Sequence, residues 1–484
     1  MAKKLTQQAL AIAQNTNTPE IIYLWQWQLG RILKAEGDIP GAIANYQEAV
    51  KNLQSLRSDL AAFDTDLQFN FREKVEPVYR ELVSLLLQPN SSNTPNQDKE
   101  NLKLGTNNKS LSQADLKLIE QARQIIESLQ LAELNNFFRE ACLDTSTTQV
   151  DRIDTEAAVI YPIILRERLE IILSLPKRPL THYSISIPQN QLEETVEKLR
   201  QNLVIRTRYT FKPSAQKLYE WLIRPLENEL AQNGINTLVF VPDGVLRNIP
   251  MAVLHDGKQY LLETYNLALN PSLELLPPQK LPQEEFKVLG AGLTEARQGF
   301  SSLEFVEKEL KKIKAEVPSQ VLLNHEFTHK NVENRLQSTF FPIVHIATHG
   351  KFSSKALDTF ILTWNDRINI NELDDLLHIS SQKKQRAVEL LVLSACETAV
   401  GDKRAALGLA GMAVKAGARS TLATLWPVND QGTAVLMSDF YQQLRNQKQT
   451  KAQALRNSQL ALLQNPMYKH PIYWAPYILI GNWL

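Results

Sequence analysis

The first 88 residues carry apolar side chains at three- and four-residue spacing, without the alternation that a half-buried strand shows. This spacing puts the apolar positions on one face of a helix. We therefore expect a helical module over residues 1–88. The module contains neither histidine nor cysteine. The usual pairs of nucleophile and base cannot be built there, so we expect it to regulate or recruit and not to perform chemistry.

Six positions of the helical module match the offsets of a tetratricopeptide repeat, in which two antiparallel helices pack closely. They are Leu29, Gly30, Leu33, Ala42, Tyr46 and Ala49. Gly37-Asp38 is expected to form the turn between the two helices, and Pro40 to open the second one. An ordinary helical hairpin is the alternative interpretation of the same pattern.

After the helical module the residue pattern changes from polar to helical and then to strand-like. Residues 89–112 are polar and carry few apolar side chains, which predicts a flexible linker and a domain boundary. Residues 113–142 return to a helical pattern, and residues 156–187 become rich in β-formers separated by short turns. Such short connections suggest an antiparallel meander. We assign residues 113–235 to a helical and antiparallel-strand subdomain.

From residue 236 to residue 484, apolar strand-like runs alternate with helical patterns. This alternation predicts right-handed crossovers and a mostly parallel sheet. The fold class is therefore α/β, a sandwich preceded by a small β-rich subdomain and the N-terminal helical module. The run Leu390–Leu393 is apolar throughout, as expected for a strand buried on both faces.

Composition narrows the possible partners and the compartment. Lysine and arginine number 53 against 52 aspartates and glutamates, so no bulk basic field exists to hold nucleic acid or an anionic membrane. No apolar run approaches the roughly 18 residues of a membrane span, and no secretory signal is evident. Two cysteines cannot form a disulfide framework. We therefore expect a cytoplasmic protein without nucleic-acid or membrane partners.

Two of the predicted strands end in residues that can perform chemistry. His349 and Gly350 follow one strand, and Cys396 ends the segment after Leu390–Leu393. If these strands are neighbours, His349 and Cys396 converge at the carboxyl edge of the sheet. An imidazole can take the proton of a thiol and return it to a leaving amine. The backbone N–H groups of Gly350 and Cys396 are candidates for an oxyanion hole. This chemistry needs neither a cofactor nor a metal.

The histidines and cysteines of the chain also allow other interpretations. His345 and His349 are four residues apart, which suits zinc on a helix, but on a strand they lie about 13 Å apart. We therefore expect His345 to be a core histidine with satisfied hydrogen bonds. Cys142 lies on an apolar face and is expected to be a buried, inert thiol. Another thiol enzyme, such as an amidotransferase, is disfavoured, because Cys396 follows the histidine and lacks flanking glycines.

The chain resembles the CHAT domain, a caspase-like family often joined to tetratricopeptide repeats, over roughly residues 115–484. The resemblance rests on motifs in the family's order: Leu238–Gly244, Ile249-Pro250, His345–Gly350, Leu393–Thr398, Gly408–Ala410, Leu425–Asp430 and Trp474–Trp483. The family is similar to caspases and separase, which are cysteine endopeptidases. The resemblance implies that His349 is the general base and Cys396 the nucleophile. Cys396 follows His349 by 47 residues, close to the spacing of about 50 in caspases.

Asp430 is a candidate for substrate binding through the same resemblance. In separase-like relatives, acidic residues after the Leu-Trp strand help to bind a basic P1 side chain. Here Asp430 stands alone and is followed by Gln431-Gly432. Its alternative role is the N-cap of the helix that starts near Gly432.

The resulting functional expectation is a cysteine endopeptidase that cleaves protein substrates through a His349–Cys396 dyad. Its helical module would regulate or target it, through a regulatory protein partner. The alternative is a non-catalytic scaffold that binds a partner through its helices. Intact His349, Gly350 and Cys396 argue against that alternative, since a retired site tends to lose such residues.

Overall fold

The computed structural model describes residues 1–56, 71–88, 112–138, 154–270, 281, 286–353, 358–384, 386–394, 396–398, 417–445 and 449–484. Of Cys396 only the backbone is described. Cys142, the Gly408–Ala410 motif and nearly all of the predicted linker 89–112 lie outside the described residues. The chain divides into two compact units. The first comprises Met1–Asp144, Ile163–Ile172 and Pro179–Ser186, and the second Thr145–Pro162, Leu173–Arg178 and Ile187–Leu484.

Eleven strands of the described residues form one sheet in the order β3-β2-β1-β4-β5-β15-β14-β12-β8-β6-β7. Their bounds are β1 (Ala157–Ile164), β2 (Leu169–Ser174), β3 (Thr181–Ile185), β4 (Thr237–Phe240), β5 (Asn266–Leu269), β6 (Val288–Gly292), β7 (Ser319–Leu323), β8 (Ile343–Ala347), β12 (Leu390–Leu393), β14 (Ser420–Thr424) and β15 (Tyr477–Gly481). Along the sheet from β1 to β7, neighbouring strands pair in parallel, except that β14 and β15 are antiparallel. The predicted α/β fold with a mostly parallel sheet and an N-terminal helical region is thus confirmed. The structure adds that β1 pairs with β4, so the β-rich segment continues the same sheet.

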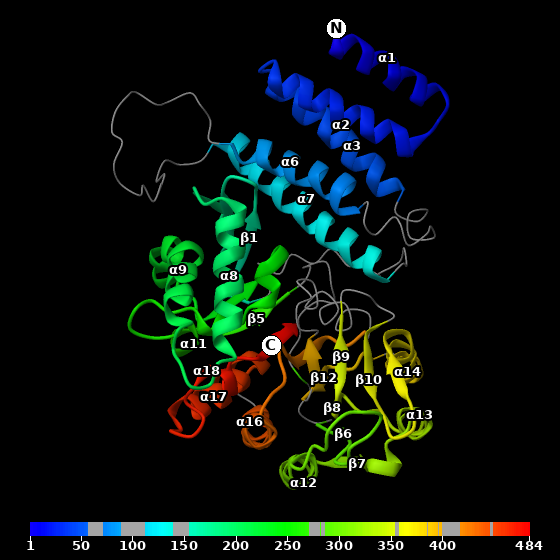
Figure 1. Cartoon of the computed structure of the whole chain (residues 1–484), viewed down its shortest axis with the longest axis vertical. Coiled ribbons are helices and arrows are strands. Elements are labelled where there is room, and N and C mark those ends of the chain that lie inside the picture. The colour runs from blue at the N-terminus through cyan, green and yellow to red at the C-terminus, as the bar shows by residue number, and fades with distance from the viewer. Residues whose placement is uncertain are drawn as a thin grey trace. The chain divides into compact units, whose positions relative to one another are not determined.

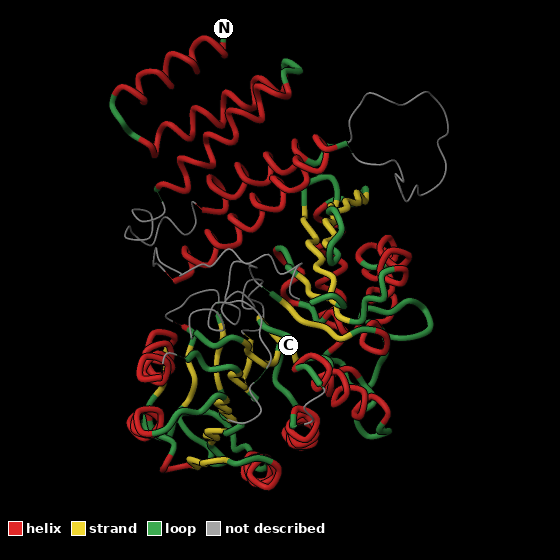
Figure 2. Tube along the Cα trace, turned by 180° about the vertical axis from the view of Figure 1, so that it is seen from behind, coloured by secondary structure: helices red, strands yellow, loops and turns green. Residues whose placement is uncertain are grey.

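Helices alternate with these strands along the second unit (Figure 2). They are α8 (Gln189–Leu203), α9 (Lys212–Leu222), α10 (Glu227–Gln232), α11 (Leu261–Thr264), α12 (Val306–Glu316), α13 (His329–Ser338), α14 (Ile370–Lys384), α16 (Asp430–Leu444), α17 (Lys451–Gln464) and α18 (Pro471–Trp474). Short 3-10 turns stand between them: η3 (Arg224–Leu226), η4 (Gly244–Asn248), η5 (Met251–Val253) and η7 (Asn324–Glu326). No helix among the described residues is both long and apolar enough to cross a bilayer.

A second, small sheet has the order β11-β10-β9-β13. Its strands are β9 (Gly350–Phe352), β10 (Phe360–Leu362), β11 (Arg367–Asn369) and β13 (Cys396–Thr398). None of the four strands was predicted, and neither was β5. Three residues are too few to carry a period-two pattern, and such strands exist only because partners pair with them.

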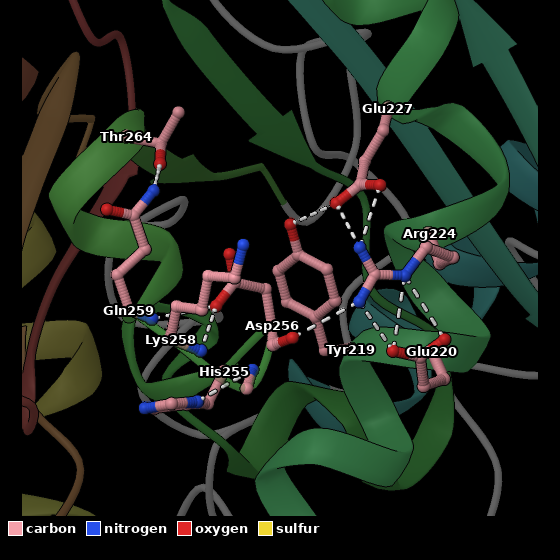
Figure 3. Close-up of polar contacts among 10 residues, drawn as sticks. Tyr219, Glu220, Arg224, Glu227, His255, Asp256, Lys258, Gln259 and Thr264 are labelled. Carbon is pink, nitrogen blue, oxygen red and sulfur yellow. Dashed lines mark hydrogen bonds and ion pairs between the residues drawn. The ribbon is translucent and has the colours of Figure 1, made fainter.

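A cluster of charged and polar side chains surrounds Arg224 (Figure 3). Its guanidinium donates to the carboxylates of Glu220 and Glu227 and to the carbonyl of Asp256. The hydroxyl of Tyr219 donates to Glu227 over 2.7 Å. Every acid at Arg224 is engaged with it or with its own turn, so this cluster braces α9, η3 and α10 against the turn at Asp256.

The first unit is built from helices that pack side by side with their neighbours in the chain (Figure 1). They are α1 (Ala2–Asn15), α2 (Pro19–Ala35), α3 (Ile39–Ser55), the π-helical turn η1 (Phe71–Val75), α6 (Glu76–Leu86) and α7 (Gln113–Phe138). The predicted hairpin of two close helices is confirmed in α2 and α3, where all six repeat-type positions are buried. A β-carbon on Gly30 would lie 2.8 Å from the ring of Tyr46, so only glycine lets that ring approach. Gly37 takes a φ of +84° in the turn.

Helix α7 packs against α6 and belongs to the same compact unit. The sequence pattern instead grouped residues 113–142 with the strands that follow. Apolar periodicity identifies a helix but not the helix that covers its apolar face. The division into compact units rests on packing alone, so the four predicted domain boundaries stay predictions.

One half-buried carboxylate joins α2, α3 and α6. Glu81 accepts hydrogen bonds from the indole N–H of Trp27, the guanidinium of Arg31 and the hydroxyl of Tyr46, at 3.0, 2.5 and 2.5 Å. Burial alone would raise the pKa of Glu81, but these hydrogen bonds outweigh it and hold the pKa below its ordinary value. The ionised form therefore stabilises the folded helices.

We predict that Glu81→Ala lowers the free energy of unfolding of the helical unit by about 2 kcal/mol, because the Tyr46 hydroxyl and Trp27 indole lose their acceptor. In the wild type, the contribution of Glu81 is full above the ordinary pKa of a glutamate. It declines as the pH falls through the lowered folded pKa. Hydrogen exchange of α2, α3 and α6 between pH 3 and pH 7 measures both effects. Exposed Glu48 on α3 supplies the control, Glu48→Ala, and an equal effect of the two substitutions would contradict the prediction.

Candidate active site

The two strands that carry the predicted dyad are neighbours. β8 and β12 pair in parallel, with Leu390 opposite Ile343 and Leu393 opposite Ile346. Both strands therefore end at the same edge of the large sheet. Beyond that edge the two segments stay together as β9 and β13, which also pair in parallel. Their register puts the Cα of Cys396 opposite that of Gly350, the residue after His349.

His349 is half-buried and is held by the loop that joins β6 to α12. Its Nε2 lies 2.8 Å from the carbonyl oxygen of Ser301. The ring of Phe300 stacks on the imidazole with centroids 5.1 Å apart and planes 29° apart. A carbonyl can only accept, so Nε2 carries the hydrogen. In the neutral ring the lone pair is then on Nδ1, which is the nitrogen available to take a proton.

Gly350 is a buried strand residue with a partner on each side, Ile361 of β10 and Cys396 of β13. The oxyanion-hole role of the Gly350 and Cys396 N–H groups stays a prediction.

Asp430 is the first residue of α16 but does not cap it. The N-cap is Asn429, whose side-chain oxygen accepts the N–H of Gly432 at 2.9 Å, so the N-cap interpretation of Asp430 is wrong by one residue. Oδ2 of Asp430 instead accepts the backbone N–H of Phe305 at 2.6 Å.

The electrostatic surroundings of Asp430 link it to His349. Burial raises the pKa of Asp430 above its ordinary value, and the carboxylates of Glu309 and Glu304 act in the same direction. The N–H of Phe305 and the charge of His349 oppose that rise. The charges of Asp430 and His349 thus influence each other, although the two residues are 81 positions apart in the chain.

His345 lies beneath the candidate site and is completely buried. Its Nε2 is 2.9 Å from a carboxylate oxygen of Glu309 on α12, and its Nδ1 is 3.1 Å from the hydroxyl of Tyr441 on α16. Both ring nitrogens thus have partners, which confirms that His345 is a satisfied core histidine. His345 and His349 contact different residues.

A family model of the CHAT domain matches residues 212–482, more than half of the chain. The chain belongs to the CHAT domain family. The match contains His349, Cys396 and Asp430, and it begins at the first residue of α9.

Two curated relatives share sequence with this CHAT protein. Tetratricopeptide repeat protein 28 of Mus musculus is 26% identical over 332 residues, and that of Homo sapiens is 24% identical over 327 residues. Each alignment covers 56% of this chain but 13% of the relative, so the chain spans about an eighth of their length.

Solved structures with a related arrangement include the Saccharomyces cerevisiae separase–securin complex. Its TM-score is 0.48 at 11% identity, over 92% of this chain and 38% of that one. The Arg-specific cysteine proteinase gingipain R has a TM-score of 0.36 at 10% identity, over 61% of this chain and 74% of that one. At these TM-scores the two structures add nothing to the family assignment.

The CHAT domain holds two site residues that sequence reasoning missed, Phe300 and Ser301. Ser301 contributes a backbone carbonyl, for which no residue type is diagnostic. Phe300 follows Gln298 and Gly299, which take φ values of +49° and +86° in a tight turn. The cluster Arg-Gln-Gly-Phe indicates a turn, but no sequence signal places that turn over His349.

We predict that His345→Leu destabilises the CHAT domain by about 3 kcal/mol, because it leaves the buried carboxylate of Glu309 without its partner. The double variant Glu309→Leu/His345→Leu should regain at least half of the loss, since no buried charge remains. Denaturant unfolding compares the two, with Glu307→Leu on the exposed side of α12 as the control. A double variant less stable than His345→Leu would refute the paired role.

Proposed function

We propose that this CHAT domain is a cysteine endopeptidase with Cys396 as the nucleophile and His349 as the general base. The observation that carries the proposal is the parallel pairing of β9 with β13, which sets the backbone of Cys396 opposite Gly350, directly after His349. Family membership supports it, because the CHAT family resembles the caspase-like peptidases. The expected substrates are proteins, and the expected compartment is the cytoplasm.

In the proposed reaction, Nδ1 of His349 takes the proton of the Cys396 thiol while its Nε2–H stays bonded to the Ser301 carbonyl. The thiolate attacks the peptide carbonyl, and the oxyanion receives hydrogen bonds from the N–H groups of Gly350 and Cys396. The imidazolium then returns the proton to the leaving amine. Water hydrolyses the resulting thioester, with His349 again accepting the proton, and frees the thiol.

We predict that Cys396→Ala abolishes peptide cleavage without unfolding the chain, because the covalent route needs the thiolate. His349→Ala should lower the rate about 10²- to 10⁴-fold, the usual contribution of a general base. Proteome-wide N-terminal profiling identifies the cleavage sites, and a thiol-reactive substrate probe measures labelling of Cys396.

The matched control is Cys142→Ala, which removes the other cysteine of the chain and should keep both cleavage and labelling. Equal cleavage by the wild type and Cys396→Ala would end the peptidase proposal at this site. Absence of both cleavage and labelling in the wild type would favour the scaffold.

The scaffold is the second candidate function, favoured by the name of the curated relatives, Tetratricopeptide repeat protein 28. Repeat-type helices can offer a groove for a peptide or partner helix. In a peptidase the same module would recruit a protein substrate or restrain the site until a partner binds.

We predict that removing residues 1–138 separates recruitment from restraint. This deletion removes α6 and α7 together, so neither helix is left without the other helix that it packs against. Recruitment lowers cleavage of a protein substrate and spares a short peptide of the same cleavage sequence, whereas restraint gives faster cleavage of both. Unchanged rates on both substrates would contradict a regulatory module.

A further inference from the structure

The loop that connects β6 to α12, residues 293–305, determines how His349 is held. Its Ser301 carbonyl accepts from the imidazole, and its Phe300 ring stacks on the imidazole and meets Phe360 edge-on with centroids 6.2 Å apart. Residues 301, 302 and 304 are exposed, so little packing holds this part of the loop. The conformation of this part of the loop must therefore be determined by its hydrogen bonds.

The first half of the loop has several anchors. The N–H of Thr294 donates to the side-chain oxygen of Asn324 at 2.8 Å. The guanidinium of Arg297 lies 3.1 Å from the ring centroid of Trp364, and the side chain of Gln298 meets that of Arg367 at 3.2 Å. These contacts hold the tip of the turn against the β10–β11 hairpin.

The second half of the loop, which follows Ser301, is held by two backbone N–H groups. The N–H of Leu303 donates to the carbonyl of Thr294 at 3.0 Å, and the N–H of Phe305 donates to the carboxylate of Asp430 at 2.6 Å. Phe305 is the N-cap residue of α12 and its own side chain cannot cap the helix. Asp430 lies in the first turn of α16. Its carboxylate therefore connects the first turn of α16 to the N-cap residue of α12.

We propose that Asp430 is a positioning residue for His349. Its carboxylate fixes Phe305 at the start of α12, and thereby the Ser301 carbonyl that orients the imidazole. The bond to the Phe305 N–H gives this carboxylate a structural role that does not depend on a basic P1 side chain. The proposal rests on the proposed function only in taking His349 as the base; the contacts of Asp430 themselves can be tested without activity.

The test compares Asp430→Ala with Asp430→Asn in the full chain. Asparagine keeps an oxygen acceptor for the Phe305 N–H, whereas alanine removes it. We expect Asp430→Ala to speed hydrogen exchange at the Phe305 amide about tenfold or more, the usual effect of losing a hydrogen bond to a charged group. The exchange rate of the His349 ring C2 hydrogen should also change, and labelling of Cys396 should slow about tenfold. Asp430→Asn should stay within about threefold of the wild type in all three measurements.

Glu304→Ala is the matched control, because Glu304 is an exposed carboxylate next to Phe305 and acts on Asp430 through its charge alone. It should leave the exchange of Phe305 unchanged. Unaltered exchange at Phe305 and His349 in Asp430→Ala would overturn the proposal. So would a loss of preference for lysine or arginine at P1 in both Asp430 variants, with unchanged exchange, since that result identifies a P1 site. A wild type that neither cleaves nor labels refutes the proposed peptidase, while the exchange measurements still decide the role of Asp430.

Discussion

The parallel pairing of β8 with β12 is the constraint on which the candidate site depends. Every residue of both strands is buried, so neither strand presents a side chain to solvent where a substrate could reach it. Reactive side chains can therefore appear only where the strands end. Because the strands are parallel and in register, they end together, and the chain segments beyond them pair again as β9 and β13. The chain segments that carry His349 and Cys396 therefore lie side by side because of the geometry of the sheet.

Helix α12 connects strand β8 to the loop that contacts His349. Its buried Glu309 bonds to His345 on β8, which ties the helix to the strand that leads to His349. The N-terminus of α12 receives the carboxylate of Asp430, and the loop before it carries Ser301 and Phe300. A buried carboxylate and histidine are costly to desolvate unless each satisfies the other. The pair therefore sets a defined position for α12, and hence for the end of the loop.

The helices of the first unit are held together in a different way. Its helices are joined by packing and by one carboxylate, Glu81, that gathers donors from α2 and α3 onto α6. The ring of Tyr46 fits against Gly30 because glycine has no side chain to exclude it. Its first 88 residues contain neither histidine nor cysteine, so we propose that this module contributes contacts and not chemistry.

The sequence by itself determined where the helices and strands with a strong apolar pattern lie. It also determined which reactive residues follow those strands. The apolar run Leu390–Leu393 and the helical spacing around Gly30 and Tyr46 predict a buried strand and a close helix pair, because local burial leaves a local pattern. The family motifs around His349 and Cys396 likewise stand in the sequence. Only the tertiary structure decided which elements meet. The short strands β9–β11 and β13 have no pattern of their own, the Ser301 carbonyl has no side-chain signature, and Phe305 is 125 residues from Asp430. Such contacts depend on how crossovers bring distant segments together, and periodicity, which reports one element at a time, does not contain that information.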